Sequence, residues 1–215
     1  MQGPDMVDEA KVRSRVYQTL SLAFYRPVGN VAQLWQSIKS MLDASQNSAE
    51  TNGTAETGPE VKALEAGVLE LEYNRLFVGP GHVACPPYES VYTRDRSGSE
   101  IGLVMGSSTS EMKTLYREAG LTISEGFKDL PDHIAVELEF MHFLCAKESE
   151  SISQSDIAGA WRKRQADFAN LHLKPWVETF ADCILRSTDS SFYKAAANLL
   201  KDFVGDEIKT LAPSE

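Results

Sequence analysis

Apolar residues recur every three to four positions along most of the chain, which is the spacing of helices that bury one face. Val12, Val16, Leu20 and Phe24 form one such stripe, and Pro27 marks the end of that helix. The same periodicity predicts further helices over residues 31–43, 59–77, 109–119, 131–148, 155–171, 176–185 and 190–208. Alternation typical of β-strands is weak everywhere, so we predict an all-α fold of about eight or more helices.

Two segments interrupt the helical pattern, and neither marks a second domain. Residues 44–59 hold almost no large apolar side chain, which predicts a flexible linker. Residues 78–106 contain glycines and prolines that forbid a continuous helix, yet they also carry valine, tyrosine and leucine. We therefore expect a single helical domain over residues 1–215, with a long irregular segment between its third and fourth helices.

Local signals place several side chains within these helices. Val68 and Leu71 are expected on the buried side of the third helix. Ser108 followed by Glu111 is a capping-box pattern and predicts the start of the fourth helix. Asp132 precedes the strongest apolar periodicity, where a carboxylate can accept hydrogen bonds from free backbone N–H groups. A helix cap is therefore one role open to Asp132.

The chain is acidic, with 31 Asp and Glu against 21 Lys and Arg and a formal net charge of −10. This balance disfavours nucleic acid, which requires a basic surface, and disfavours attachment to anionic lipid through basic residues. No apolar run approaches the ~20 residues of a membrane span, and the first residues do not resemble a secretory signal. We expect a cytoplasmic protein with no nucleic-acid partner, no stable membrane insertion and a charge that suits a basic partner.

The three cysteines are odd in number and widely spaced along the chain, at Cys85, Cys145 and Cys183. This pattern forms neither a disulfide framework nor a CxxC metal site. Reduced cytoplasmic thiols are therefore the simplest interpretation.

Metal chemistry is the main alternative that the sequence offers. Glu139 and His142 form the Glu-x-x-His half-site of carboxylate-bridged di-iron bundles, but the chain has no second copy of it. His133 and Glu137 are also one helical turn apart, without an obvious third zinc ligand. A metal-dependent helical-bundle enzyme using Glu139 and His142 is thus the alternative interpretation. The sequence shows no nucleophile or phosphate-loop motif, so we expect no catalytic residue, no cofactor and no metal.

An ordered set of motifs carries a family resemblance. They read YNRLFVGP at 73–80, PPYESVY at 86–92, PDH at 131–133 and HLKPW at 172–176. In this order and at these spacings, the sequence resembles the TorD/DmsD/NarJ-type chaperones of molybdenum-containing oxidoreductases. The similarity covers roughly residues 10–205.

The resemblance implies an all-helical, non-catalytic cytoplasmic protein that binds the twin-arginine signal peptide of a molybdenum-containing reductase or dehydrogenase. Such a chaperone holds the client's catalytic subunit back from export until the molybdenum cofactor is inserted. Tyr88 stands where the family often has Trp, and Glu89 replaces a frequent Gly. The residues that the resemblance implicates in peptide binding are Leu76, Phe77, Gly79, Pro80, Pro86, Pro87, Tyr88, Ser90, Tyr92, Asp132 and His133.

Physical reasoning agrees with a ligand that is cationic and partly apolar. Carboxylates bind arginine through paired hydrogen bonds, so Asp132 with Glu137 or Glu89 is expected to meet the arginine pair. The expected apolar floor comprises Leu76, Phe77, Tyr88 and Tyr92. A generic helical adaptor is a further interpretation. The sequence does not identify the client, and it leaves open whether the protein is a monomer or a domain-swapped dimer.

Overall fold

The computed structural model describes residues 4–46, 66–81, 83–93, 105–123 and 128–211, and the regular structure within them is helical. The elements in chain order are α1 (Pro4–Phe24), α2 (Val31–Gln46), α4 (Ala66–Tyr73), the π-helical turn η1 (Asn74–Val78), α5 (Glu89–Tyr92), α6 (Ser107–Glu118), α7 (Ile134–Glu150), α8 (Ser155–Phe168), the π-helical turn η2 (Ala169–Leu173), α9 (Val177–Ser187) and α10 (Ser191–Thr210). Tyr88 and His133 form an isolated β-bridge, and the described residues contain no sheet. The all-α prediction is confirmed.

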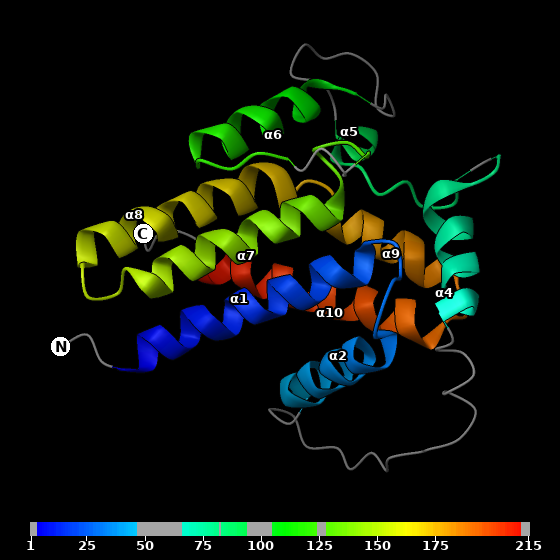
Figure 1. Ribbon diagram of the computed structural model, residues 1–215, viewed down its shortest axis with the longest axis horizontal. Helices are drawn as coiled ribbons and strands as arrows, with labels where there is room; N and C mark the ends of the chain where they lie inside the picture. Colours follow the sequence, from blue (N-terminus) through cyan, green and yellow to red (C-terminus); the bar gives the residue numbers. More distant parts are fainter. Residues whose placement is uncertain (1–3, 47–65, 82, 94–104, 124–127, 212–215) are drawn as a thin grey trace.

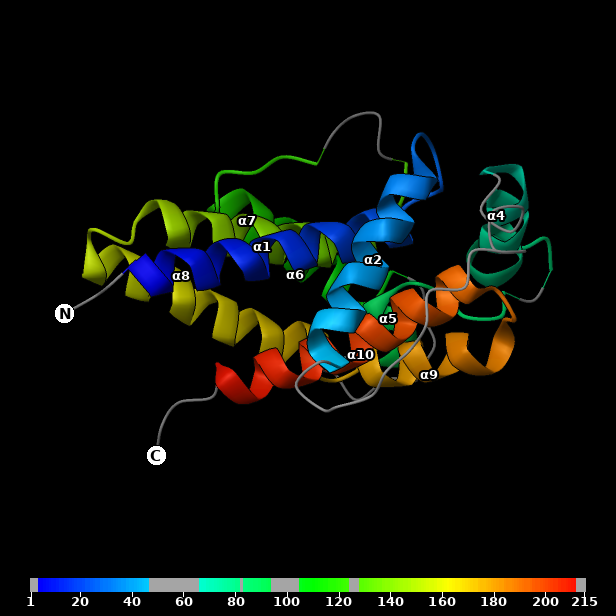
Figure 2. The ribbon, with the colours of Figure 1, turned by 90° about the horizontal axis from the view of Figure 1, so that it is seen from below.

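Helices α1 and α7 lie side by side and form the central pair of the bundle (Figure 1). α8 packs on α7, and α10 packs on α9, α2 and α1 (Figure 2). α6 lies above α7 and α8 in Figure 1 and contacts α5. This arrangement explains why α7 carries apolar residues on several sides, because it has neighbours on several sides.

An aromatic cluster ties η1 to helices that are distant in sequence. Phe77 packs against Phe24 of α1, Phe180 of α9 and Tyr193 of α10, with ring centroids 6.2, 6.0 and 5.5 Å apart. These tilted and edge-to-face contacts are the geometry that aromatic rings prefer. The cluster therefore anchors the start of the irregular segment in the core.

A buried charge network around Arg13 forms a second anchor. The Arg13 guanidinium donates to Glu148 of α7 at 3.0 Å, to Glu207 of α10 at 2.8 Å and also to Gln165 of α8. Gln165 donates in turn to Glu148 at 2.9 Å. Because an unpaired buried charge is strongly unfavourable, these side chains depend on one another, and together they join α1, α7, α8 and α10.

The helices lie close to the predicted ranges, and Val16, Leu20 and Phe24 of α1 are buried as predicted, but three residues predicted to be buried are exposed. Val12 is 57% exposed, because Arg13 and its ionic partners occupy the inward side of α1. In α4, Val68 and Leu71 are 47% and 72% exposed, so their predicted burial is wrong. Leu69 faces the core instead, since the buried stripe of α4 runs one residue out of phase with the predicted one.

The ends of three predicted segments also differ in detail. The described part of the predicted helix 59–77 is α4, which gives way to η1 at Asn74. α6 begins after Gly106 without a side-chain cap, and Ser108 is buried within its first turn, so the capping-box prediction is wrong. Of the predicted linker 44–59, residues 44–46 extend α2 and the rest lie outside the described residues. No helix among the described residues is long and apolar enough to cross a membrane.

Candidate functional site

The motifs at 86–92 and 131–133 come together at the start of α7. The backbone N–H of Glu89 donates to Asp132 O at 3.0 Å, and the N–H of Ile134 donates to Pro87 O at 2.9 Å. These bonds flank the isolated β-bridge and satisfy polar backbone groups that would otherwise be buried without partners. The paired segments therefore hold their side chains in fixed directions.

Asp132 lies at the centre of this junction and is fully buried. Its carboxylate accepts hydrogen bonds from Ser90 N at 3.1 Å and from Thr109 Oγ1 at 2.8 Å, so it joins α5 to α6. The cap of α7 is His133, whose Nδ1 accepts from Ala135 N at 3.1 Å. The prediction of Asp132 as the cap of this helix is thus wrong, because the carboxylate turns toward α5 and α6.

His133 lies between two tyrosine rings. Tyr25, which directly follows α1, stacks on the imidazole with ring centroids 6.5 Å apart, and Tyr88 meets it edge-on at 5.5 Å. Each hydroxyl donates to an exposed carboxylate at 2.6 Å, Tyr25 to Glu139 and Tyr88 to Asp129. Burial lowers the pKa of His133 to about 4, against the opposing effect of Asp129. The imidazole is therefore neutral near pH 7 and does not cancel the charge of either carboxylate.

The HLKPW motif packs against the PPYESVY motif. His172 Nδ1 lies 3.1 Å from Glu89 Oε2, and both side chains are buried. The ring of Tyr92 stacks on Trp176 with centroids 5.4 Å apart. Burial raises the pKa of Glu89, and the hydrogen bond with His172 opposes the rise. All the C-terminal and central motifs of the resemblance thus converge at one place in the fold.

Glu137 lies within this junction, one turn into α7, and is fully buried. Among the described residues its carboxylate oxygens form no well-aligned hydrogen bond, although the side chains of Trp176 and Glu89 lie beside them. Burial, followed by the charges of Glu89 and Asp132, raises the pKa of Glu137 well above its usual range. Its buried position keeps this carboxyl group from reaching a ligand at the surface in this conformation.

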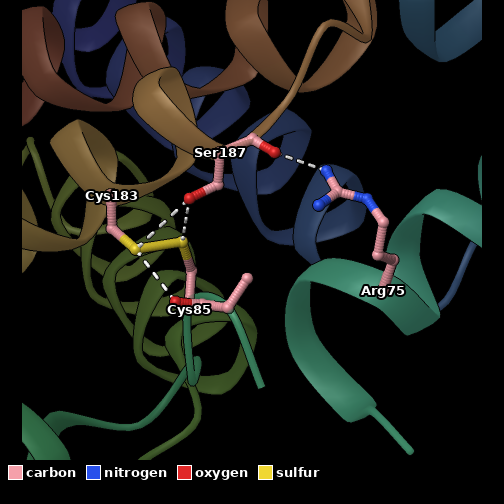
Figure 3. Close-up of a disulfide and its surroundings, with 5 residues drawn as sticks. Arg75, Cys85, Cys183 and Ser187 are labelled. Carbon is pink, nitrogen blue, oxygen red and sulfur yellow. Dashed lines mark hydrogen bonds between the residues drawn. A yellow bond between two sulfur atoms is a disulfide. The ribbon is translucent and has the colours of Figure 1, made fainter. Parts of the chain in front are cut away.

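A disulfide joins Cys85 of the irregular segment to Cys183 of α9 (Figure 3). The hydroxyl of Ser187 lies 3.6 Å from the Cys85 sulfur, and the Ser187 carbonyl accepts a hydrogen bond from Arg75. The prediction of reduced thiols is wrong for this pair, because the irregular segment folds back onto α9 and brings distant cysteines together. Cys145 is a free thiol and is buried in the core.

The turn before Cys85 requires a glycine at position 79. Gly79 has a φ of 104°, a conformation that side chains disfavour, and an added Cβ would lie 3.3 Å from Gly81 N. Its N–H donates to Asn74 O at 2.7 Å and closes η1. The glycine thus allows the chain to leave η1 toward Pro80 and the disulfide.

The eleven predicted site residues divide into a buried and an exposed group. The buried group comprises Leu76, Phe77, Pro87, Ser90, Asp132 and His133. The group that is at least partly exposed comprises Gly79, Pro80, Pro86, Tyr88 and Tyr92. Phe77 and Tyr92 both pack on Phe180, with centroids 6.0 and 6.1 Å apart, which links the first motif to the others. Leu76 and Phe77 therefore lie beneath the surface in this conformation and not on an open floor.

The residues of the metal-enzyme alternative have separate surroundings. Glu139 binds the Tyr25 hydroxyl, and His142 Nδ1 lies 2.8 Å from Ser14 Oγ. Within the described ranges, no group of three or more His, Cys, Asp or Glu side chains is placed to hold a metal ion. The Glu-x-x-His pattern thus occupies a helix face that makes contacts with α1.

A groove of about 730 Å³ runs beside α7, and sequence reasoning missed it. The residues that line it are Tyr25, Tyr116, Leu121, Thr122, Ile123, Val136, Glu139, Phe140, His142, Phe143, Ala146, Lys147 and Glu150. A smaller cavity of about 350 Å³ lies over Glu89 and His172. Periodicity does not reveal the groove, because α7 is apolar on several sides and its pattern does not say which side stays uncovered.

The fold and the site define an all-helical protein with a largely apolar surface groove beside a buried junction of sequence motifs. The sequence profile of the nitrate reductase delta subunit family matches residues 29–182, and the chain belongs to this family.

Named relatives align along nearly the whole chain. The chain is 25% identical over 214 residues to the chaperone protein TorD of Vibrio cholerae, which covers 93% of each protein. It is 26% identical over 215 residues to the perchlorate reductase assembly chaperone protein of Dechloromonas aromatica, covering 96% of this chain and 93% of that one. The crystal structure of a candidate redox enzyme maturation protein from Archaeoglobus fulgidus matches with a TM-score of 0.50 and 24% identity, over 90% and 94% of the two chains. This structural likeness supports the fold.

Proposed function

We propose that this protein is a dedicated chaperone for the assembly of a molybdenum-containing oxidoreductase. It binds the twin-arginine signal peptide of the client's catalytic subunit in the cytoplasm and holds back export until the molybdenum cofactor is inserted. Its role is binding, and it catalyses no reaction of its own.

The observation that carries the proposal is similarity over nearly the whole chain to proteins named as a TorD chaperone and a perchlorate reductase assembly chaperone. The geometry is consistent with it, because a groove with apolar walls and nearby exposed carboxylates suits a segment with apolar and cationic residues. None of the residues implied by the motifs lines this groove, and Tyr88 is connected to it through His133, which Tyr25 of the groove also contacts. The buried group holds the exposed residues in place.

The test is titration of a client signal peptide with the purified protein, followed by fluorescence anisotropy. The peptide is the leader of the catalytic subunit that co-purifies with this protein and is identified by mass spectrometry. Replacing its arginine pair by two lysines should weaken binding, because lysine keeps the charge but loses the paired hydrogen bonds to carboxylate. A generic helical adaptor predicts equal affinity for both peptides.

Asp132→Ala tests whether the junction supports binding. The change removes the acceptor that joins Ser90 and Thr109, so α5 and α6 loosen and the affinity for the peptide should fall. Circular dichroism establishes that the variant keeps its helices. Unchanged affinity would remove Asp132 from the site.

A further inference from the structure

One long face of α7 is not covered by its neighbouring helices. α1 and α8 pack along other sides of α7, while Val136, Phe143 and Ala146 stay partly exposed. With Phe140 these residues recur at spacings of three and four, so they form one stripe along the helix. Leu121 and residues beside it form the opposite wall of the groove.

The dimensions of the groove suit a segment of polypeptide. From Val136 to Glu150 the helix rises about 21 Å, at about 1.5 Å per residue. This length accommodates about 14 residues of a second helix, or about six residues of extended chain. The volume of about 730 Å³ lies within the range of clefts that enclose ligands.

The charges along the groove are negative on balance. Among the described residues that line the groove, Lys147 is the only lysine or arginine. Its ammonium nitrogen lies 2.7 Å from a carboxylate oxygen of Glu150. Glu139 is held by the neutral hydroxyl of Tyr25, a bond that leaves its charge in place. A cationic segment is therefore favoured over an anionic one.

Tyr25, which lines the groove, contacts His133 of the motif junction. Tyr25 and Tyr88 both pack against His133, and their hydroxyls orient Glu139 and Asp129. Two exposed carboxylates are thus fixed around one neutral imidazole at the end of an apolar groove. A carboxylate that is already oriented binds a guanidinium with less loss of side-chain entropy.

We propose that the groove binds the client's leader with its apolar run along α7 and its arginine pair at Asp129 and Glu139. This inference rests on the proposed function and deepens it, because it fixes the direction of the peptide. It also assigns arginine recognition to two surface carboxylates, in place of the buried Asp132.

The test uses the full-length protein and a labelled synthetic peptide in which two adjacent arginines precede about 12 apolar residues. Ala146→Arg fills the apolar stripe and adds a positive charge, so binding should weaken at least about 20-fold. Glu139→Gln and Asp129→Asn should each weaken binding about five-fold and reduce its dependence on salt. Asp202→Asn, an exposed carboxylate on α10, is the matched control and should leave the affinity unchanged.

Misfolding could also weaken the binding of the peptide, so the test includes a variant that is expected to bind more tightly. Lys147→Gln removes the cation that compensates Glu150, so the same peptide should bind about five-fold more tightly. If wild type binds the peptide and these variants bind it equally well, the groove is not the site, while the proposed function stands. If wild type does not bind the peptide, the proposed function and this inference both fail.

Discussion

Replacing Cys183 by serine removes the covalent link between the irregular segment and α9. The bond joins residues separated by 98 positions in the sequence. In the chain-entropy description, closing a loop of about 100 residues restricts the unfolded chain by about 4.7 kcal/mol at 25 °C. Because the free energy of unfolding of a domain is about 5–15 kcal/mol, the variant should lose about a third or more of its stability.

Equilibrium unfolding in urea, followed by tryptophan fluorescence, measures this loss. With a slope of about 2–3 kcal/mol per molar urea, the midpoint should fall by about 2 M. Reductant should lower the wild-type midpoint similarly and leave Cys183→Ser unchanged, which separates the disulfide from side-chain packing. Equal midpoints for oxidised and reduced wild type would refute the entropic reasoning.

Further predictions concern buried charges. Arg13→Ala should lose about 3–5 kcal/mol of unfolding free energy, because buried Glu207 loses its cation and buried Glu148 keeps, among the described residues, only Arg162 as a cationic partner. Arg15→Ala, at an exposed position, should change the unfolding free energy by no more than about 0.5 kcal/mol, and urea unfolding of both variants measures the difference. Burial raises the pKa of Glu137, so its stability contribution is full below the unfolded pKa and falls as pH rises. The free energy of unfolding of Glu137→Gln should therefore exceed that of wild type by more at pH 8 than at pH 5. A larger excess at pH 5 would contradict the raised pKa of Glu137. Burial lowers the pKa of His133 to about 4, so its contribution is full above about pH 6.5. His133→Asn keeps a side-chain acceptor for the cap of α7. Its loss of unfolding free energy relative to wild type should shrink by about 3 kcal/mol between pH 7 and pH 4. Parallel pH profiles of the two proteins would exclude the lowered pKa of His133 as a source of stability.

The helical architecture was predictable because each helix carries its own apolar periodicity and its own stop signals. The phase of α1 was predictable too, since Val16, Leu20 and Phe24 are buried as the pattern predicts. The inward position of Arg13 was not, because no local pattern shows its partners Glu148 and Glu207, which are far away in the sequence. Val12 then takes the inward position in the prediction and is exposed in the structure. Long-range charge pairing therefore changed the orientation predicted for one turn of α1, and the apolar periodicity held for the rest of the helix.

The candidate site was predictable as a set of motifs and not as a surface. Glu89 and His172 are 83 residues apart, and nothing local pairs them. The sequence predicts Asp132 as a helix cap or an arginine ligand, whereas its carboxylate accepts hydrogen bonds from Ser90 and Thr109. No sequence signal singles out Tyr25, because its role depends on a stacking contact between the residue that follows α1 and His133 at the start of α7.

The junction of motifs also has a consequence for the order of events during synthesis. Tyr88 pairs with His133, and Tyr92 stacks on Trp176, so the junction needs segments spread over about half of the chain. At about 5–20 residues per second, roughly 4–18 s separate the synthesis of residue 88 from that of residue 176. Contacts of such long range form late, since loop closure must precede them. A chain that ends before Trp176 therefore lacks the stacking partner of Tyr92 and the last contact of the junction.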